Sequence, residues 1–213
     1  MSTSVHEIAA ALLRAGAVHL RPDEPFTFAS GLRSPVYCDN RILLGDVTAR
    51  RAITAAFTAH CEGAEILAGP ATGGIPWVAW AAEALGLPMA YVRGAAKGHG
   101  RGRQIEGAPV KGRRVVLLED TVSTGESVLA AAAALRAEGA ELVRCVCIFT
   151  WGWQSTANIF ADAALPLVSL TALPALLDVA AESGALNPAQ RAVVEAWVRD
   201  PQGWGADSTG DRK

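Results

Sequence analysis

Glu119 and Asp120 are adjacent carboxylic acids that follow an apolar run, Val115 to Leu118, and precede a turn rich in hydroxyl groups. Carboxylates accept hydrogen bonds and bind hard cations, so their natural targets are sugar hydroxyls, or a magnesium ion reached through water. The turn offers the opposite chemistry, because hydroxyl and backbone N–H groups donate to anions. A ribose diol held beside a phosphate satisfies both parts of this segment.

The elements around these residues place them at the rim of an α/β sheet. The apolar run is typical of a buried central strand, and a stripe at helical spacing follows it at Val128, Leu129, Ala132 and Leu135. Ligands bind at the carboxyl ends of strands in such sheets, where a helix presents free N–H groups to an anion. We therefore expect a phosphate at Ser123 to Ser127, with Gly125 allowing close approach of the backbone. In the simpler alternative, the acids only end a strand and the hydroxyl residues only cap a helix.

The segment from Val115 to Ser127 resembles the phosphoribosyl pyrophosphate signature of type I phosphoribosyltransferases, in which an apolar strand, an acidic pair and a Thr/Ser-Gly turn occur in this order. The resemblance implies an α/β fold with a mainly parallel central sheet flanked by helices. It also implies that the phosphoribosyl donor is bound by Glu119, Asp120, Thr121, Val122, Ser123, Thr124, Gly125, Glu126 and Ser127.

A second segment, residues 93–112, is basic, rich in glycine and almost free of apolar residues. A loop of this length without secondary structure of its own is uncommon in a compact domain unless it is functional. The segment is similar to the mobile catalytic loop of orotate phosphoribosyltransferases, which implies that Arg93, Lys97 and His99 are catalytic and contact the donor. Arg and Lys neutralise an anion and His can donate a proton near neutral pH, as a departing pyrophosphate requires. We expect a flexible cationic lid here; a solvated basic loop is the alternative.

A third segment runs from an apolar stretch that begins at Ile66 into a tight turn of small residues, Ala71, Thr72 and Gly73. It is similar to the pyrophosphate loop of the same family, whose backbone N–H groups would face the diphosphate. The alternative is an ordinary strand-to-helix connection. The helix that follows is expected to end at Gly86.

A fourth segment, Phe26 to Arg41, predicts two short strands around Ser30-Gly31. It resembles the N-terminal hood that covers the base in orotate phosphoribosyltransferases, predicted here for about residues 1–41, and its aromatic rings could enclose a flat ring. The resemblance implies orotate contacts from Phe28, Arg33, Val36, Tyr37, Ser123 and Trp151. A small hairpin that supports a dimer contact is a compatible alternative.

Three positions depart from the family pattern. Ala29 stands where some members have a lysine, Gly94 where many have a second basic residue, and Thr150-Trp151 where many have an Asp-Arg pair near the base. Trp151 can stack on a pyrimidine but cannot pair with its carboxylate. We therefore expect orotate recognition to depend on hood N–H groups, on Ser123 or on Arg33. The departures bear on base specificity more than on the chemistry.

The composition fits one enzyme domain, because 213 residues with 51% hydrophobic content can bury a sizeable core. We expect that domain over residues 1–200 and a frayed polar tail over 201–213. The net charge of −2 argues against binding to nucleic acid. The four cysteines lack Cys-x-x-Cys spacing and are expected to be buried reduced thiols. Ser4 and Glu7 form a capping box rather than part of a signal peptide or membrane span, so a cytoplasmic location is the expectation.

Together the segments predict a member of the orotate phosphoribosyltransferases, glycosyltransferases that join orotate to phosphoribosyl pyrophosphate in pyrimidine biosynthesis and release pyrophosphate. The resemblance implies Mg²⁺ held by the substrate, with no ligand directly from the protein, and a homodimer that shares its lid across the interface. Two alternatives stay open. A phosphoribosyltransferase for another base, such as a purine, should lack the hood and the Lys-x-His lid. A non-catalytic, ligand-sensing regulator on the same fold should carry a basic face or added DNA-binding helices.

Overall fold

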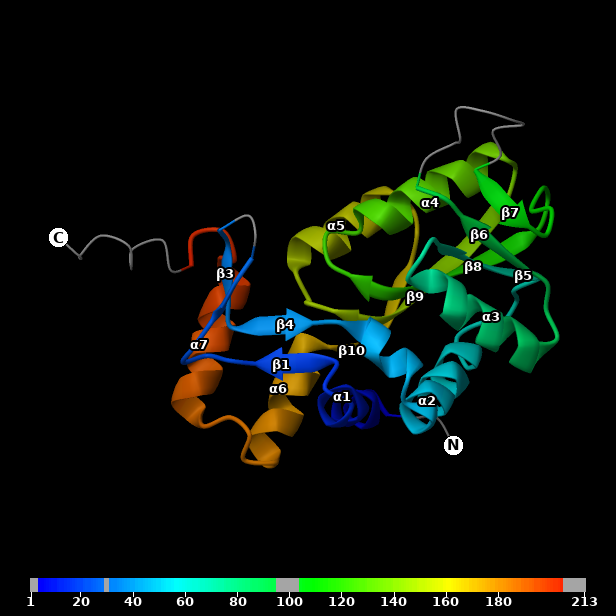
Figure 1. The fold of residues 1–213 in the computed structure, drawn as a ribbon. Coiled ribbons are helices and arrows are strands. Elements are labelled where there is room, and N and C mark those ends of the chain that lie inside the picture. Colours follow the sequence, from blue (N-terminus) through cyan, green and yellow to red (C-terminus); the bar gives the residue numbers. More distant parts are fainter. Residues whose placement is uncertain (1–3, 29–30, 95–103, 205–213) are drawn as a thin grey trace.

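The structure is a computed structural model that describes residues 4–28, 31–94 and 104–204. Its centre is a six-stranded sheet in the order β10-β9-β8-β5-β6-β7, with helices on both faces (Figure 1). Neighbouring strands are parallel except β7, which is antiparallel to β6. The strands are β5 (Ile66–Pro70), β6 (Met89–Val92), β7 (Ile105–Gly107), β8 (Arg114–Val122), β9 (Glu141–Thr150) and β10 (Leu167–Ala172). The predicted fold class is confirmed.

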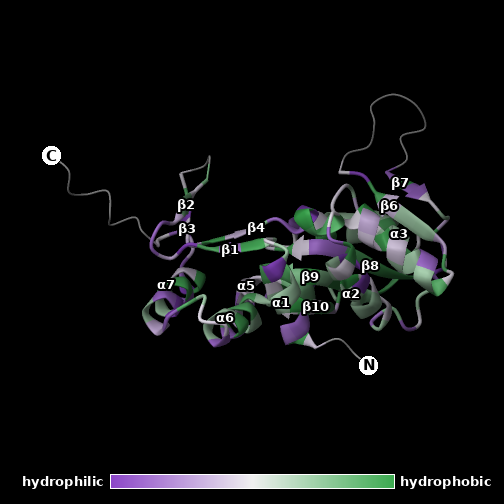
Figure 2. Ribbon diagram, turned by 60° about the horizontal axis from the view of Figure 1, so that its bottom comes forward, coloured by the Kyte–Doolittle hydropathy of each residue, from purple (hydrophilic) through white to green (hydrophobic). Residues whose placement is uncertain are grey.

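The helices form two layers, one on each side of the sheet. One face is covered by α1 (Val5–Arg14), α2 (Val47–Thr58), α3 (Gly74–Leu85) and α6 (Leu173–Glu182), and α7 (Pro188–Arg199) packs against α6. The other face is covered by α4 (Glu126–Ala137) and α5 (Gln154–Asp162). Figure 2 shows hydrophobic strands in the interior and hydrophilic residues on the outer faces of the helices. Val116 and Leu118 of β8 belong to the first core, and Val115 and Leu117 belong to the second, so both faces of this strand are buried. Burial on both faces explains its uninterrupted apolar run.

Local signals mark the ends of several helices as the sequence predicts. Ser4 with Glu7 forms a capping box at α1, and Asn187 with Gln190 forms another at α7. Gly86 ends α3 in the left-handed conformation, at φ 64°. These ends are set by residues next to the helix, which is why the sequence alone could locate them.

The hood consists of two small antiparallel ladders. β2 (Phe26–Thr27) pairs with β3 (Arg33–Ser34), as predicted, and β1 (Val18–Leu20) pairs with β4 (Val36–Cys38), which was not predicted. The predicted extent of the hood, residues 1–41, is corrected at its start. Helix α1 packs against α6 and β10, and its Ile8 and Leu12 are buried in the main core, because its apolar face needs a larger partner than the hood offers.

The predicted lid, residues 93–112, is also corrected. Residues 105–107 form β7, whose Ile105 pairs with Val92, and Val110 is buried in the core under α4. The sparse apolar residues of this segment therefore anchor it to the sheet edge. Between the paired residues Arg93 and Gln104, only Gly94 is described.

The predicted tail begins later than residue 201. Trp204 packs against the main core, and the guanidinium carbon of Arg33 lies 5.9 Å from the centre of its ring. A cation over an aromatic face is attractive, and this contact gives residues 201–204 a defined place beside the hood.

Two further expectations concern the cysteines and membrane-spanning helices. Cys38, Cys61, Cys145 and Cys147 are free, and burial raises the pKa of each thiol. Within the three described ranges, no helix is both long and apolar enough to cross a membrane.

Candidate active site

The predicted donor-binding segments meet at one edge of the sheet. β5, β6, β8 and β9 lie side by side and parallel, so the residues that follow them share the carboxyl rim (Figure 1). Ala71–Gly73 follows β5, Arg93 follows β6, Ser123–Gly125 follows β8 and Trp151 follows β9. Segments far apart in the chain are therefore neighbours here.

The turn after β5 lies directly against the acidic pair. A Cβ atom added to Gly73 would be 2.6 Å from Oδ2 of Asp120, and one added to Gly69 would be 2.6 Å from the carbonyl oxygen of Leu118. Real Cβ atoms do not approach that closely. At Gly69 the neighbour is main chain, so only glycine fits, whereas at Gly73 the Asp120 carboxylate would have to move. The peptide bond between Ala71 and Thr72 is cis, and the Ala71 N–H donates to the Val92 carbonyl at 2.7 Å.

The acidic residues themselves lie within β8, not after it. The predicted strand, Val115 to Leu118, continues to Val122. Because successive strand residues face opposite sides, Glu119 lies toward the first turn of α4, where Ser127 Oγ is 3.5 Å from its Oε2, whereas Asp120 lies toward Gly73. Hydrogen bonds link the pair along the strand: the Asp120 N–H donates to Glu119 Oε1 at 3.0 Å, and the Thr121 N–H donates to Asp120 Oδ1 at 2.5 Å.

Burial changes the acidity of both groups. Glu119 is only 5% exposed, and this desolvation, together with the negative charge of Asp120, raises the pKa of Glu119 to about 8. Burial also raises the pKa of Asp120. The two carboxyl groups therefore hold a proton near neutral pH unless a hydroxyl or a cation stabilises their charged form.

This shift predicts a pH-dependent stability. From about pH 4.5 to about pH 8 the folded state binds more protons at Glu119 than the unfolded state does. The free energy of unfolding therefore falls as the pH rises through this window. Melting temperatures measured across it should fall less steeply for Glu119→Gln than for the natural chain, whereas Glu138→Gln, at the exposed end of α4, should leave the slope unchanged. Identical slopes for Glu119→Gln and the natural chain would contradict the shift.

Helix α5 packs against the turn that is predicted to bind phosphate, Ser123–Ser127. Thr156 Oγ1 donates to the Ser123 carbonyl oxygen at 2.6 Å. Gly125 adopts φ 83°, and a Cβ there would be 2.5 Å from Cε2 of Phe160. Sequence reasoning missed Thr156 and Phe160, although they are the two buried residues of α5 and lie one helical turn apart.

This packing predicts a stability cost for Gly125→Ala. The left-handed conformation costs a non-glycine residue about 1–2 kcal/mol, and crowding in a packed core adds about 1–3 kcal/mol. Gly184→Ala is the matched control, because Gly184 has φ 75° but nothing within 4 Å of an added Cβ. In urea denaturation, Gly125→Ala should lose clearly more stability than Gly184→Ala. Equal losses would mean that Phe160 moves aside without cost.

Several predicted base contacts lie in the hood, and they differ in how exposed their side chains are. Tyr37 lies between Phe26 and Phe28, with ring centres at 5.5 and 6.3 Å, and Phe28 is 37% exposed. An aromatic surface is therefore present there. Val36 is buried in the main core, so its side chain offers no surface to a ligand, and a contact between orotate and the hood N–H groups stays a prediction.

Trp151 is engaged by other aromatic rings. It stacks on Trp153 at 5.7 Å with an interplanar angle of 18°, and it meets Phe149 and Trp197 edge-on at 5.2 Å. These contacts account for Trp151 as a packing residue. Its stacking on a pyrimidine stays a prediction.

The base of the predicted lid is closed by a pair of hydrogen bonds. The Arg93 N–H donates to the Gln104 carbonyl at 2.9 Å, and Gln104 Nε2 donates to the Arg93 carbonyl at 3.1 Å. The Arg93 guanidinium lies 3.6 Å from Glu106 Oε1. Lys97 and His99 lie outside the described residues.

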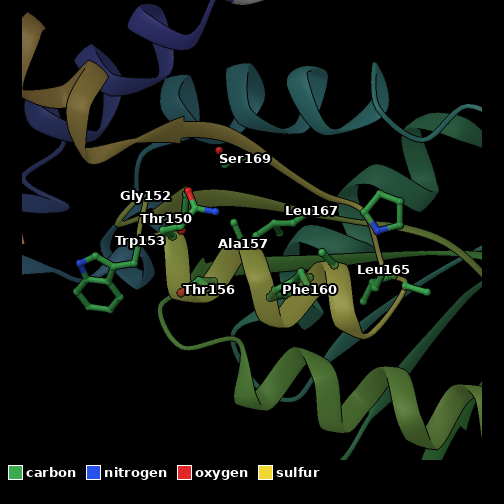
Figure 3. A pocket seen from close by; sticks show the side chains of 13 residues that line it. Thr150, Gly152, Trp153, Thr156, Ala157, Phe160, Leu165, Leu167 and Ser169 are labelled. Atoms are coloured by element: carbon green, nitrogen blue, oxygen red, sulfur yellow. The ribbon is translucent and has the colours of Figure 1, made fainter.

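A cavity of about 650 Å³ lies between α5 and the β9–β10 edge and reaches the rim at Thr150 and Gly152, on either side of Trp151 (Figure 3). Ala157 and Phe160 of α5 line it together with Leu167 and Ser169 of β10. Its lining includes none of the predicted site residues among those that the structure describes. The cavity therefore adjoins the support of the phosphate turn without being part of the candidate site.

The donor set at the rim suits a hard cation only in combination with other oxygen ligands. Within residues 4–28, 31–94 and 104–204, no three His, Cys, Asp or Glu side chains converge as a metal cluster would. Glu119 and Asp120 supply carboxylate oxygens, which Mg²⁺ prefers, but it commonly completes its shell with water and phosphate oxygens.

Comparisons with known proteins agree on one family. The sequence model of the phosphoribosyl transferase domain family matches residues 49–157. The chain is 45% identical to the orotate phosphoribosyltransferase of Bacillus caldolyticus over 205 residues, covering 94% of this chain and 99% of that protein. It is 46% identical to the orotate phosphoribosyltransferase of Bacillus subtilis, covering 92% of each.

A solved structure gives the same result. The crystal structure of orotate phosphoribosyltransferase from Aeropyrum pernix superposes with a TM-score of 0.70 at 32% identity. The match covers 84% of this chain and 99% of that one. The similarity therefore extends over most of both chains.

Proposed function

The chain belongs to the orotate phosphoribosyltransferases, and on that premise we propose how its rim residues divide the work of the reaction. The activity is transfer of a phosphoribosyl group from phosphoribosyl pyrophosphate to orotate in pyrimidine biosynthesis. Its steps fall to residues of the rim, the lid and the hood. The observation that carries this division is the contact of Gly73 with the Asp120 carboxylate, which joins two segments that resemble different parts of one donor site.

We assign the donor to three neighbouring turns. The ribose hydroxyls donate to Glu119 and Asp120, whose charged forms they stabilise against burial. The 5′-phosphate accepts hydrogen bonds from the turn at Ser123–Ser127, at the positive end of α4. The diphosphate lies against the backbone of Ala71–Gly73, beneath Arg93. Mg²⁺, when held by the diphosphate and ribose hydroxyls, would supply charge neutralisation there, and Glu119 and Asp120 are the rim carboxylates that could contact it through water.

The reaction is a displacement at the anomeric carbon. The bond from this carbon to the pyrophosphate oxygen breaks with its electron pair, and a bond to the ring nitrogen of orotate forms while that nitrogen gives up its proton, which balances the proton that the pyrophosphate gains. Positive charge develops on the ribose ring while negative charge grows on the leaving group. Arg93 and Lys97 stabilise that negative charge, and His99 donates a proton to it.

The hood supplies the base site in this scheme. Phe28 and Tyr37 present aromatic surface to the flat pyrimidine, and Arg33 provides positive charge for its carboxylate. The Arg33 guanidinium lies over the ring of Trp204, and this contact gives the positive charge a defined place in the hood. Ser123, at the end of β8, offers a hydroxyl to the ring.

We also propose a homodimer in which the lid of one subunit closes over the site of the other. Mixing Lys97→Ala with Asp120→Asn after reversible dissociation tests this arrangement. If the lid crosses the interface, a mixed dimer contains one site with both residues intact and regains part of the activity. No recovery in mixtures that native mass spectrometry shows to contain mixed dimers would place the lid over its own site.

The enzymatic test is the Mg²⁺-dependent loss of orotate ultraviolet absorbance when purified protein is mixed with phosphoribosyl pyrophosphate, with uracil and purine bases in parallel. Turnover of orotate alone supports the assignment of the hood as an orotate site. Turnover of another base would keep the donor site and overturn the base assignment. Donor binding without any turnover would favour a sensing role instead.

A further inference from the structure

We propose that Asn40 is a positioning residue for the phosphoribosyl transfer. Its side chain ties the hood to Asp120 and Thr121 of β8. Asn40 opens the 3-10 helix η1 (Asn40–Leu44), which follows the last hood strand, and it is only 2% exposed. The inference rests on the proposed role of Asp120 in binding ribose. It concerns a residue whose partners lie eighty and eighty-one positions further along the chain.

The contacts of the Asn40 side chain are directed at the site. Its Nδ2 donates to the main-chain carbonyl of Asp120 at 3.0 Å and to Thr121 Oγ1 at 2.9 Å. A carbonyl oxygen can only accept, so this contact sets the orientation of the amide. Both contacts hold main-chain and side-chain atoms immediately beside the carboxylate that we assign to the ribose.

Stability alone does not account for an amide at this position. Asn40 Oδ1 is buried and has no partner within the described residues. An unpaired buried acceptor is unfavourable and offsets part of what the two donated hydrogen bonds contribute. Those two bonds also fix the geometry of Asp120 and Thr121 relative to η1.

The residues next to Asn40 also surround the end of β8. Burial raises the pKa of the Cys38 thiol, and the side chain of Thr121 lowers it. Burial also raises the pKa of Asp120; the positive charge of Arg41 opposes that rise and the negative charge of Asp39 adds to it. Asn40 bonds directly to β8, and the residues beside it act on the acidic pair through their charge.

This contact matters because the reaction joins the ring nitrogen of the base, assigned to the hood, to the anomeric carbon of the donor, assigned to the rim. The base and the anomeric carbon must be aligned, and a misplacement of about 1 Å can cost 10²-fold in rate. Asn40 fixes the Asp120 main chain relative to β4. It acts through Asp120 and Thr121 rather than by touching the substrate.

Asn40→Asp is the most direct test, because it keeps the size of the side chain and removes both N–H donors. We expect kcat/KM for orotate to fall by roughly tenfold, less than the cost of a full 1 Å displacement. Hydrogen exchange should rise in residues 119–125. Asn187→Ala is the matched control: it removes the cap of α7, should leave kcat/KM unchanged and should raise exchange only near α7. Natural kcat/KM and natural exchange in Asn40→Asp would overturn the proposal.

A double-mutant cycle gives a second test that does not depend on Asn40→Asp alone. Thr121→Val removes one acceptor of Asn40, whereas Thr121→Ser retains it and serves as the control. The effects of Asn40→Ala and Thr121→Val on kcat/KM should be non-additive, because both break one contact. Additive effects would overturn the proposal. If Asp120→Asn itself leaves the donor KM unchanged, the proposed ribose site fails instead, whatever the Asn40 variants do.

Discussion

Lys97→Ala is expected to lower kcat by about 10²–10³-fold, the usual cost of removing one group that stabilises charge in the transition state. The pyrophosphate gains negative charge as it leaves, so a lysine over it contributes more to the transition state than to the bound substrate. KM values for orotate and for the donor should therefore change much less than kcat. Steady-state kinetics with saturating Mg²⁺ measure both.

Lys111→Ala is the matched control for this prediction. Lys111 is exposed and lies beyond β7, in the part of the basic segment that is anchored to the sheet. Its loss should leave kcat close to that of the natural chain. Near-natural turnover in Lys97→Ala would remove Lys97 from the catalytic machinery.

Asp120→Asn is expected to raise the KM for phosphoribosyl pyrophosphate by about 10–10²-fold, because a hydrogen bond to a charged group is worth about 1.5–3 kcal/mol. Asparagine keeps an oxygen that can accept from the Thr121 N–H and fits beside Gly73. The substitution therefore changes charge with little change in shape. The KM for orotate should move far less, since the base is assigned to the hood.

Asp162→Asn, at the exposed end of α5, controls for loss of a carboxylate elsewhere. Donor binding can also be measured without catalysis, by calorimetry in the absence of orotate. A donor KM and affinity unchanged in Asp120→Asn would show that this carboxylate does not hold the ribose.

The candidate site could be located from the sequence to the extent that its signals are local. The run before Glu119, the turn around Gly125 and the small residues at Ala71–Gly73 each combine a strand, a turn and a helix start within a short stretch. Parallel strands then bring these turns to one rim, which is a general property of the fold. What the sequence could not show is that β8 continues through the acids, because strand length there depends on pairing with β9.

The parts that were missed depend on contacts between distant residues. β7 is held by pairing with β6, and nothing in residues 105–107 alone indicates a strand. Asn40 is a polar residue in a polar stretch, and only its partners on β8 distinguish it. Val36 was assigned to the base because the hood motif includes it, and only the structure shows that its side chain belongs to the main core.

The antiparallel strand β7 also has a consequence for how the protein behaves at high concentration. A sheet edge with unpaired N–H and C=O groups is a template on which strands of other molecules can add. Here the outer strand has only three residues and carries Glu106, and Pro109, which lacks an N–H, follows it. An edge this short and charged gives a second molecule little to pair with, so the strand that follows the predicted lid protects this edge of the sheet against aggregation.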